Sequence, residues 1–452
     1  MLGQKLSGIS VFILVLLVIV AIIVDTSIIN LATSAGGLRS SVLDIALFAF
    51  MVLVFGAGQY IVMRFVRQEY KDRDKSNINS KYTVVGFRLG MGLLDRIVTI
   101  SQYVLLVILV FAIFQMILMT SYHILILKST IIISYGLTSI ILALLAIRFF
   151  SWFRSNRNLV VLAYACAIFM ISLNAAVTII HSNNEFANDP AYVRPVRSPT
   201  GAYTSAENPL SLIYVISSVL SFLLAWIATV LLLRHYSRKL GRTKYWIIVS
   251  IPLGYFLSQF QSLFLYSFAE LRISDPVLFG IIYNLIFSVS SPAGGVLFGI
   301  AFWTLSKRLN SKTVKTYMII SAYGMTLLFA ANQPTSLILI PYPPFGLTSI
   351  CFMILAAYLV FLGIYSSSIS VAEDSRLRQS IRKIAFKELQ FLDVIGTAEM
   401  EREIVRKVIP MFAMVKDNML KETGISSSLE EDDMKSYLQE VLEEVKNKRK
   451  YS

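Results

Sequence analysis

The sequence predicts an all-α polytopic integral membrane protein, a bundle of about ten transmembrane helices followed by a small cytoplasmic helical tail. Of its 452 residues, 56% are hydrophobic and only 15% are charged. Ordinary soluble domains carry about 25% charged residues. Long apolar stretches recur along the chain, and Lys and Arg gather in alternate loops between them. We therefore expect the chain to lie in a lipid bilayer.

Ten apolar stretches have roughly the 20 residues that a helix needs to cross the hydrocarbon core. We expect spans near residues 8–31, 42–63, 98–120, 125–147, 158–180, 209–233, 245–267, 276–305, 316–331 and 346–366. The membrane part then comprises residues 1–366 and the tail residues 367–452. The first stretch also fits a secretory signal, but its apolar part, from Ile9 to Val24, is longer than most signal cores. We expect it to remain as an uncleaved anchor.

The distribution of basic residues predicts the orientation of the bundle. One set of loops, together with the N-terminus, holds 21 Lys and Arg residues, whereas the other set holds five before the tail begins. Cytoplasmic loops are enriched in Lys and Arg, and ten crossings place every basic loop on one side. We expect a plasma-membrane protein with both termini in the cytoplasm. The net charge of +14 then reflects topology, so we expect no nucleic-acid partner.

The tail differs in composition from the membrane part, with 15 basic and 16 acidic residues from Ser367 onward. Apolar residues between Leu377 and Leu392 recur at three-to-four spacing, which indicates an amphipathic helix ending near Gly396. A second helix is expected after it, with Pro410 as an interruption. The apolar faces of these helices must be buried against another surface. We expect a helical cap on the bundle, self-association or a cytoplasmic protein partner through residues 372–448.

Ionisable residues are scarce within the predicted spans. Asp25, Asp44, Asp95 and Lys128 lie near span ends, where charged groups reach the membrane interface more cheaply than at the centre. We expect these four side chains to be interfacial. Their position disfavours a proton pump built on a buried carboxylate.

Neutral polar residues within the spans are the candidate ligand or pathway residues. They are Asn174, Gln259, Gln261, Asn284, Ser288, Ser291 and Pro292. Asn284, Ser288 and Ser291 share a helix face, and Pro292 frees a backbone carbonyl, so we expect a kinked span at 276–305 with a polar stripe. Such a stripe lines a pathway or pocket, or it holds helices together. The sequence leaves both interpretations open.

The sequence lacks the motifs of several kinds of chemistry. Its two cysteines fall within predicted spans and its three histidines are dispersed, so we expect neither a structural disulfide nor a metal site. The motifs H-E-x-x-H, G-x-S-x-G and G-x-x-x-x-G-K-[ST] do not occur. We expect no cofactor and no enzymatic activity.

Part of the chain resembles a known group of proteins. The segment Tyr342-Pro343-Pro344-Phe345-Gly346, the run from Gly363 to Arg378 and residues 388–400 resemble multi-pass membrane proteins from archaea of the ammonia-oxidising lineage. The resemblance covers mainly residues 340–410. It implies an archaeal host and a membrane location, but that group has no assigned activity and so transfers no functional residue.

The expected function is that of a non-enzymatic membrane sensor or signal-coupling protein acting through its cytoplasmic tail. The last span passes directly into an amphipathic helix, which is suited to transmit motion. A channel or transporter with a polar path at the kinked span 276–305 is the alternative. A structural subunit of a membrane complex is a further alternative.

Overall fold

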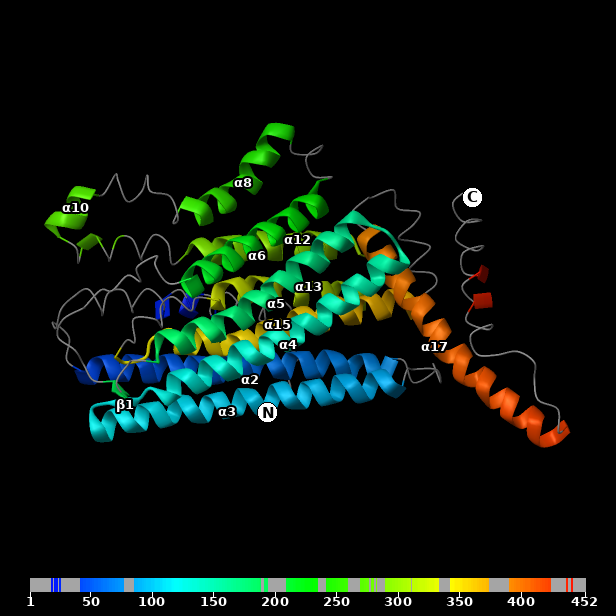
Figure 1. Cartoon of the computed structure of the whole chain (residues 1–452), viewed down its shortest axis with the longest axis horizontal. Helices are drawn as coiled ribbons and strands as arrows, with labels where there is room; N and C mark the ends of the chain where they lie inside the picture. The colour runs from blue at the N-terminus through cyan, green and yellow to red at the C-terminus, as the bar shows by residue number, and fades with distance from the viewer. Residues whose placement is uncertain are drawn as a thin grey trace.

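In the computed structural model, long and roughly parallel helices form a bundle, and a helical tail projects from one end (Figure 1). The structure describes residues 18, 20–22, 24–25, 41–76, 85–187, 191–193, 209–234, 241–258, 269–275, 278–279, 282, 289–309, 311–332, 342–373, 390–423, 436–437 and 440–441. The described helices are α2 (Ser41–Ser76), α3 (Val85–Met119), α4 (Leu125–Ser155), α5 (Leu159–Glu185), α6 (Pro209–Leu233), α8 (Arg242–Ser258), α10 (Ala269–Ser274), α12 (Ser290–Lys307), α13 (Lys312–Ala331), α15 (Leu347–Glu373) and α17 (Gln390–Thr423).

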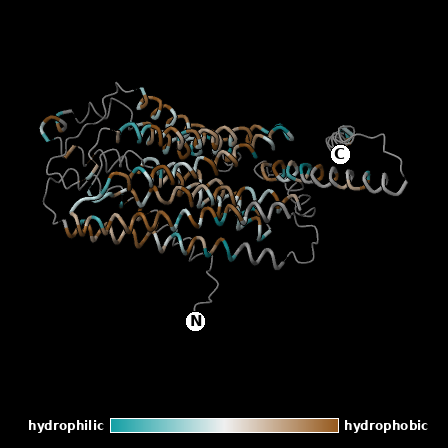
Figure 2. The backbone as a smooth tube through the Cα atoms, turned by 60° about the horizontal axis from the view of Figure 1, so that its bottom comes forward, coloured by the Kyte–Doolittle hydropathy of each residue, from teal (hydrophilic) through white to brown (hydrophobic). Residues whose placement is uncertain are grey.

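Seven of these helices are long and apolar enough to cross a membrane. They are α2, α3, α4, α5, α6, α13 and α15, found among the described residues. Figure 2 shows that the helices of the bundle are apolar along most of their length and that α17 is mixed in character. The expected spans near 8–31, 245–267 and 276–305 lie partly outside the described residues, so the number of ten remains a prediction. The chain is a multi-pass membrane protein in contact with lipid.

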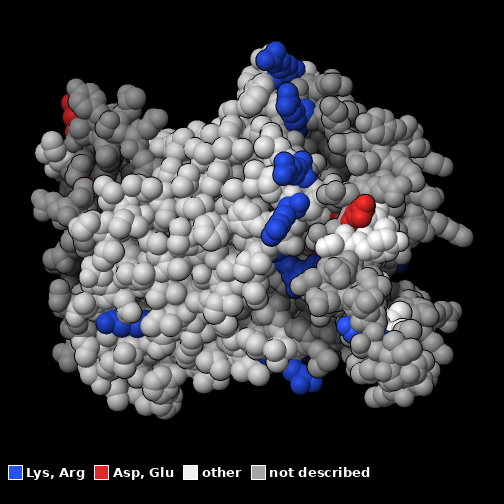
Figure 3. All heavy atoms as spheres, turned by 45° about the vertical axis from the view of Figure 1, so that its right-hand side comes forward, with Lys and Arg blue, Asp and Glu red and all other residues white. Residues whose placement is uncertain are grey.

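Most of the described Lys and Arg side chains gather at one end of the bundle, where they form a row in Figure 3, and one lies apart from it. We call this the basic end. It is formed where α4 is followed by α5 and α12 by α13, and α17 packs against it. At the opposite end a two-stranded antiparallel sheet joins β1 (Tyr122–His123) to β2 (Tyr192–Val193). This sheet ties the turn after α3 to the segment that follows α5.

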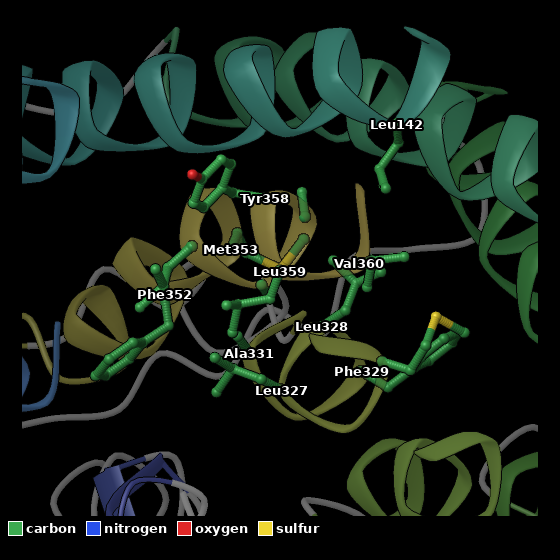
Figure 4. Packing of buried hydrophobic residues seen from close by; sticks show 14 of the residues in the cluster. Leu142, Leu327, Leu328, Phe329, Ala331, Phe352, Met353, Tyr358, Leu359 and Val360 are labelled. Atoms are coloured by element: carbon green, nitrogen blue, oxygen red, sulfur yellow. The ribbon is translucent and has the colours of Figure 1, made fainter. Parts of the chain in front are cut away.

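The helix α15 occupies the centre of the bundle. Its most apolar window is entirely buried, and it lies between α4 and α13, as Figure 4 shows for Leu142, Leu328 and Val360. The sequence Pro343-Pro344 precedes the helix, and Gly346 adopts a φ of 84°, which favours glycine because it has no Cβ. The backbone of Gly346 then accepts from Ile350 N at 3.1 Å, which closes the first turn.

Two glycines let α13 and α15 approach closely. A Cβ on Gly324 would lie 2.7 Å from Val360 N, and one on Gly363 would lie 2.2 Å from Ser321 Oγ. Small residues at such contacts let helix backbones come close together. Because lipid chains are as apolar as the helix surfaces, the hydrophobic effect does not drive helix association within the bilayer, and dispersion forces between closely packed helices do. The helices α13 and α15 therefore pack closely against each other at two points of the core.

The tail helix differs from its expected form. The sequence indicates a helix end near Gly396 and an interruption at Pro410, but α17 runs without a break through both residues. Gly396 is buried against Val371 of α15, and a Cβ there would lie 2.4 Å from Val371 Cγ1. This glycine is thus a contact point between the tail and the bundle, and not a helix terminus.

Candidate functional site

Three of the seven candidate polar residues lie in the described part of the chain. Asn174 is buried on α5, and its Oδ1 accepts a hydrogen bond from Ser217 Oγ of α6 at 2.8 Å. Ser139 Oγ of α4 likewise donates to Ser172 O of α5 at 3.0 Å. Such bonds between transmembrane helices stabilise their association. Asn174 therefore connects α5 to α6.

The described part of the stripe at 276–305 faces a neighbouring helix. Ser291 Oγ donates to Phe329 O of α13 at 2.8 Å, and Pro292 is buried near the start of α12. A Cβ on Gly295 would lie 2.8 Å from Phe329 Cβ, and one on Gly299 would lie 2.1 Å from Thr326 Oγ1. This end of the stripe thus packs closely on α13. Gln259, Gln261, Asn284 and Ser288 lie outside the described residues.

A different set of polar contacts follows α15 from one end to the other. Four residues of this helix each form a hydrogen bond with a residue outside it: Thr348, Cys351, Tyr358 and Tyr365. The last three are seven residues apart, so they share one face of the helix. We call this set the α15 polar line. Sequence reasoning missed it because its partners lie far away along the chain.

At the opposite end from the tail, the polar line begins at Asp25. This side chain is buried, and its Oδ2 accepts from Thr348 Oγ1, Ser349 Oγ and Ser349 N. Asp25 is therefore enclosed by the protein, whereas its place near the membrane interface remains a prediction. The first turn of a helix has unpaired N–H groups and a partial positive charge, both of which favour a carboxylate. Asp25 thus caps α15 from another helix.

We expect an Asp25→Ala variant to be less stable by about 1–3 kcal/mol, because the buried donors of Thr348 and Ser349 lose their acceptor. Asp25→Asn keeps an acceptor oxygen and should lose much less. Unfolding of the purified protein in detergent, followed by circular dichroism, measures both changes. Equal stability of the two variants would contradict the capping role.

In the middle of the bundle, the polar line joins α3 and α2. Gln102 Nε2 of α3 donates to Cys351 O at 3.1 Å. Tyr358 OH donates to Asp95 Oδ1 of α3 at 3.2 Å, and Arg67 Nη2 of α2 lies 3.1 Å from the other oxygen of Asp95. Asp95 therefore connects the centre of the bundle to its lipid-facing helices.

At the basic end, the polar line reaches the tail. Glu399 of α17 is only 1% exposed. Its Oε2 accepts from Trp152 Nε1 of α4 at 2.9 Å, and its Oε1 accepts from Tyr365 OH of α15 at 3.5 Å. The guanidinium of Arg148 lies over the ring of Tyr365, 5.4 Å from its centroid. A single tail carboxyl group thus meets two helices of the bundle, and we call this the tail junction.

Apolar packing and a second carboxylate complete the tail junction. Phe391 is buried, and its ring stacks on that of Phe149, with centroids 6.2 Å apart. Leu392 and Ile395 are also buried. Glu401 accepts from Ser155 Oγ at the end of α4. The first three turns of α17 are therefore part of the bundle.

The far half of α17 is different. Met411, Met414 and Val415 are exposed and lie at the i, i+3 and i+4 positions of one helix face. Figure 1 shows this half extending away from the bundle. The tail helix thus combines a docked half with a projecting half.

Comparisons with known proteins give no relative for this chain, since no family model, curated protein or solved structure matches it. The resemblance over residues 340–410 therefore remains a prediction. The function must be argued from the geometry alone.

Proposed function

We propose that this protein is a non-enzymatic membrane sensor or signal-coupling protein in which α15 transmits a change within the bundle to the tail helix α17. The basic end faces the cytoplasm of the host cell in this proposal, and the membrane is the plasma membrane. Cytoplasmic loops are enriched in Lys and Arg, and the row of basic side chains in Figure 3 supports this orientation.

The observation that carries the proposal is the tail junction. Glu399 is held by Trp152 of α4 and by Tyr365 of α15 at the same time. A displacement of one helix against the other must therefore break a hydrogen bond or move the tail. Packed helices shift between discrete arrangements, so a small shift at the junction becomes a larger one at the projecting end of α17.

A channel or transporter with a path at 276–305 receives less support. Ser291 is bonded to the backbone of α13 and Gly299 contacts α13 closely, so the described part of the stripe supports a helix contact more than a path. The tail junction instead favours coupling.

Spin labels at Arg157→Cys and Val415→Cys, in a Cys166→Ala background, test the proposal. Both positions are exposed, one at the basic end and one on the projecting half of α17. A Tyr358→Phe change removes the hydroxyl that joins α15 to Asp95, about 10 Å along α15 from Tyr365 by helical rise. We expect the label-to-label distance distribution in lipid nanodiscs to shift or broaden.

The matched control is Tyr192→Phe, which removes an exposed hydroxyl at the opposite end. It should leave the distribution unchanged. If Tyr358→Phe also leaves the distribution unchanged, the tail is a static cap and the coupling proposal fails.

A further inference from the structure

The groove between α2 and α3 has a volume of about 700 Å³, which is within the usual range for small-molecule sites. It is lined by Gly56, Gln59, Tyr60, Met63, Arg64, Arg67, Gln68, Thr99, Gln102, Tyr103 and Leu106. None of these residues belongs to the candidates singled out from the sequence. Tyr60 and Tyr103 are exposed on the outer surface of these two helices. The groove therefore opens sideways, toward lipid.

The groove has an apolar limit and a basic limit. Gly56, Gln59, Met63 and Arg67 follow one side of α2, and helical rise separates the first from the last by roughly 16 Å. The apolar limit is formed by Gly56 and Leu106. The amides of Gln59 and Gln102 lie next, and the guanidinium groups of Arg64 and Arg67 lie toward the basic end. A bilayer lipid has the same order, from hydrocarbon to charged headgroup.

Two buried amide side chains, Gln59 and Gln102, belong to the lining at the middle of the groove. Gln59 and Gln102 are 4% and 2% exposed, and no described residue donates to the Oε1 atom of either. Gln102 is oriented by its bond to Cys351 O. Both oxygen atoms are buried beneath the groove surface, so a ligand meets them only after the amide groups turn toward it. A buried acceptor without a donor costs about 1–3 kcal/mol, and this cost favours such a turn toward a ligand that carries hydroxyl or amide N–H groups.

The end of the groove nearest the basic end favours an anion. Arg64 and Arg67 supply two positive charges, and Asp95 supplies one negative charge next to Arg67. Thr99 Oγ1 accepts from Arg67 Nη2 at 2.7 Å, which fixes the guanidinium at the mouth of the groove. Arginine recognises phosphate well because its planar group offers paired donors.

We propose that this groove binds an amphiphile of the adjacent leaflet with an anionic phosphate headgroup, a hydroxyl-bearing middle part and a hydrocarbon chain. This inference rests on the proposed function, because the amphiphile would be the signal that the protein senses. The headgroup lies at Arg64 and Arg67, the hydroxyl groups at Gln59 and Gln102, and the chain at Leu106. A shift of Arg67 on binding would be transmitted to α15 through Asp95 and Tyr358.

Native mass spectrometry of the full chain tests the inference with phosphatidylglycerol as the probe. We expect Arg64→Gln and Gln59→Leu each to weaken binding about tenfold, the effect of one hydrogen bond or charge contact. Gln59→Leu should leave thermal stability in lipid-free detergent unchanged or higher, because it removes a buried oxygen without a described donor. The matched control Arg157→Gln changes an exposed basic residue outside the groove and should bind normally.

Further arms separate the possible sources of the phosphate. Phosphatidylcholine should bind at least tenfold more weakly than phosphatidylglycerol, because its headgroup carries no net charge. If inorganic phosphate or glycerol phosphate at equal concentration displaces phosphatidylglycerol, the site binds a soluble anion, and the inference is overturned. Equal binding by wild type, Arg64→Gln and Gln59→Leu would also overturn it, since the lipid would then bind elsewhere.

The failure of this inference is distinguishable from the failure of the coupling proposal. If phosphatidylglycerol binding depends on Arg64 and Gln59 but Tyr358→Phe does not change the tail distance, the groove stands and the coupling fails. If Tyr358→Phe changes the tail distance but binding ignores Arg64 and Gln59, the coupling stands and the ligand assignment fails.

Discussion

A Gly363→Ala variant will be less stable than the wild-type bundle by at least about 1–3 kcal/mol, the usual cost of overpacking a core. The added Cβ would lie 2.2 Å from Ser321 Oγ, 2.6 Å from Tyr317 O and 2.7 Å from Ser321 N. Two of these three atoms belong to the backbone of α13. They cannot rotate away, so the two helices must separate.

Denaturant unfolding of the purified protein in detergent measures this loss. Gly136→Ala in α4 is the matched control, because a Cβ there would lie 3.8 Å from Ile179 Cδ1, an ordinary contact. Alanine is the better helix former by up to about 1 kcal/mol, so the control should be neutral or slightly stabilising. If both variants unfold at the same denaturant concentration as the wild type, the close approach of α13 and α15 is wrong.

The second large effect is expected at the tail junction, from Trp152→Phe. This change keeps an aromatic ring beside Phe149 but removes the indole donor to Glu399. Hydrogen bonds to charged groups contribute about 1.5–3 kcal/mol, so the docked half of α17 should open about tenfold to a hundredfold more often. Hydrogen exchange of residues 391–401 measures this opening.

A second change at the junction separates the hydrogen bond from packing. Adding Tyr365→Phe and Glu399→Leu to Trp152→Phe removes the buried carboxylate along with both of its described donors, and replacing all partners by apolar groups costs less than removing one. Exchange in the triple variant should therefore be slower than in Trp152→Phe alone. Exchange faster than in Trp152→Phe would show that Glu399 is held chiefly by other contacts.

Local sequence patterns were sufficient to identify much of the fold. The expected spans that begin near residues 42, 98, 125, 158, 209, 316 and 346 coincide with α2, α3, α4, α5, α6, α13 and α15. Hydrophobicity over about 20 residues determines whether a segment enters the bilayer, so no tertiary information is needed. The tail helix was expected in two pieces because Gly396 and Pro410 are usual helix breakers. Packing of Gly396 against Val371 offsets this local preference.

The candidate site was much less predictable. Asn174 has the polar partner expected of a buried amide within a span. Gln59 and Gln102 also carry side-chain amides within spans, but they were not singled out from the sequence. Their importance depends on a groove formed between two helices. Asp25 is likewise buried by Thr348 and Ser349, more than 300 positions away along the chain.

The sequence by itself determined that this chain enters a membrane and where most of its spans lie, and it predicted which loops share a side. Only the tertiary structure decided which helix is central. The most apolar windows of α3 and α15 have mean hydropathies of 2.6 and 2.4, yet 28% of the first and all of the second are buried. Lipid chains are as apolar as a helix interface. Hydropathy therefore cannot distinguish a helix that faces lipid from one that faces protein, and the polar line on α15 emerges only from packing.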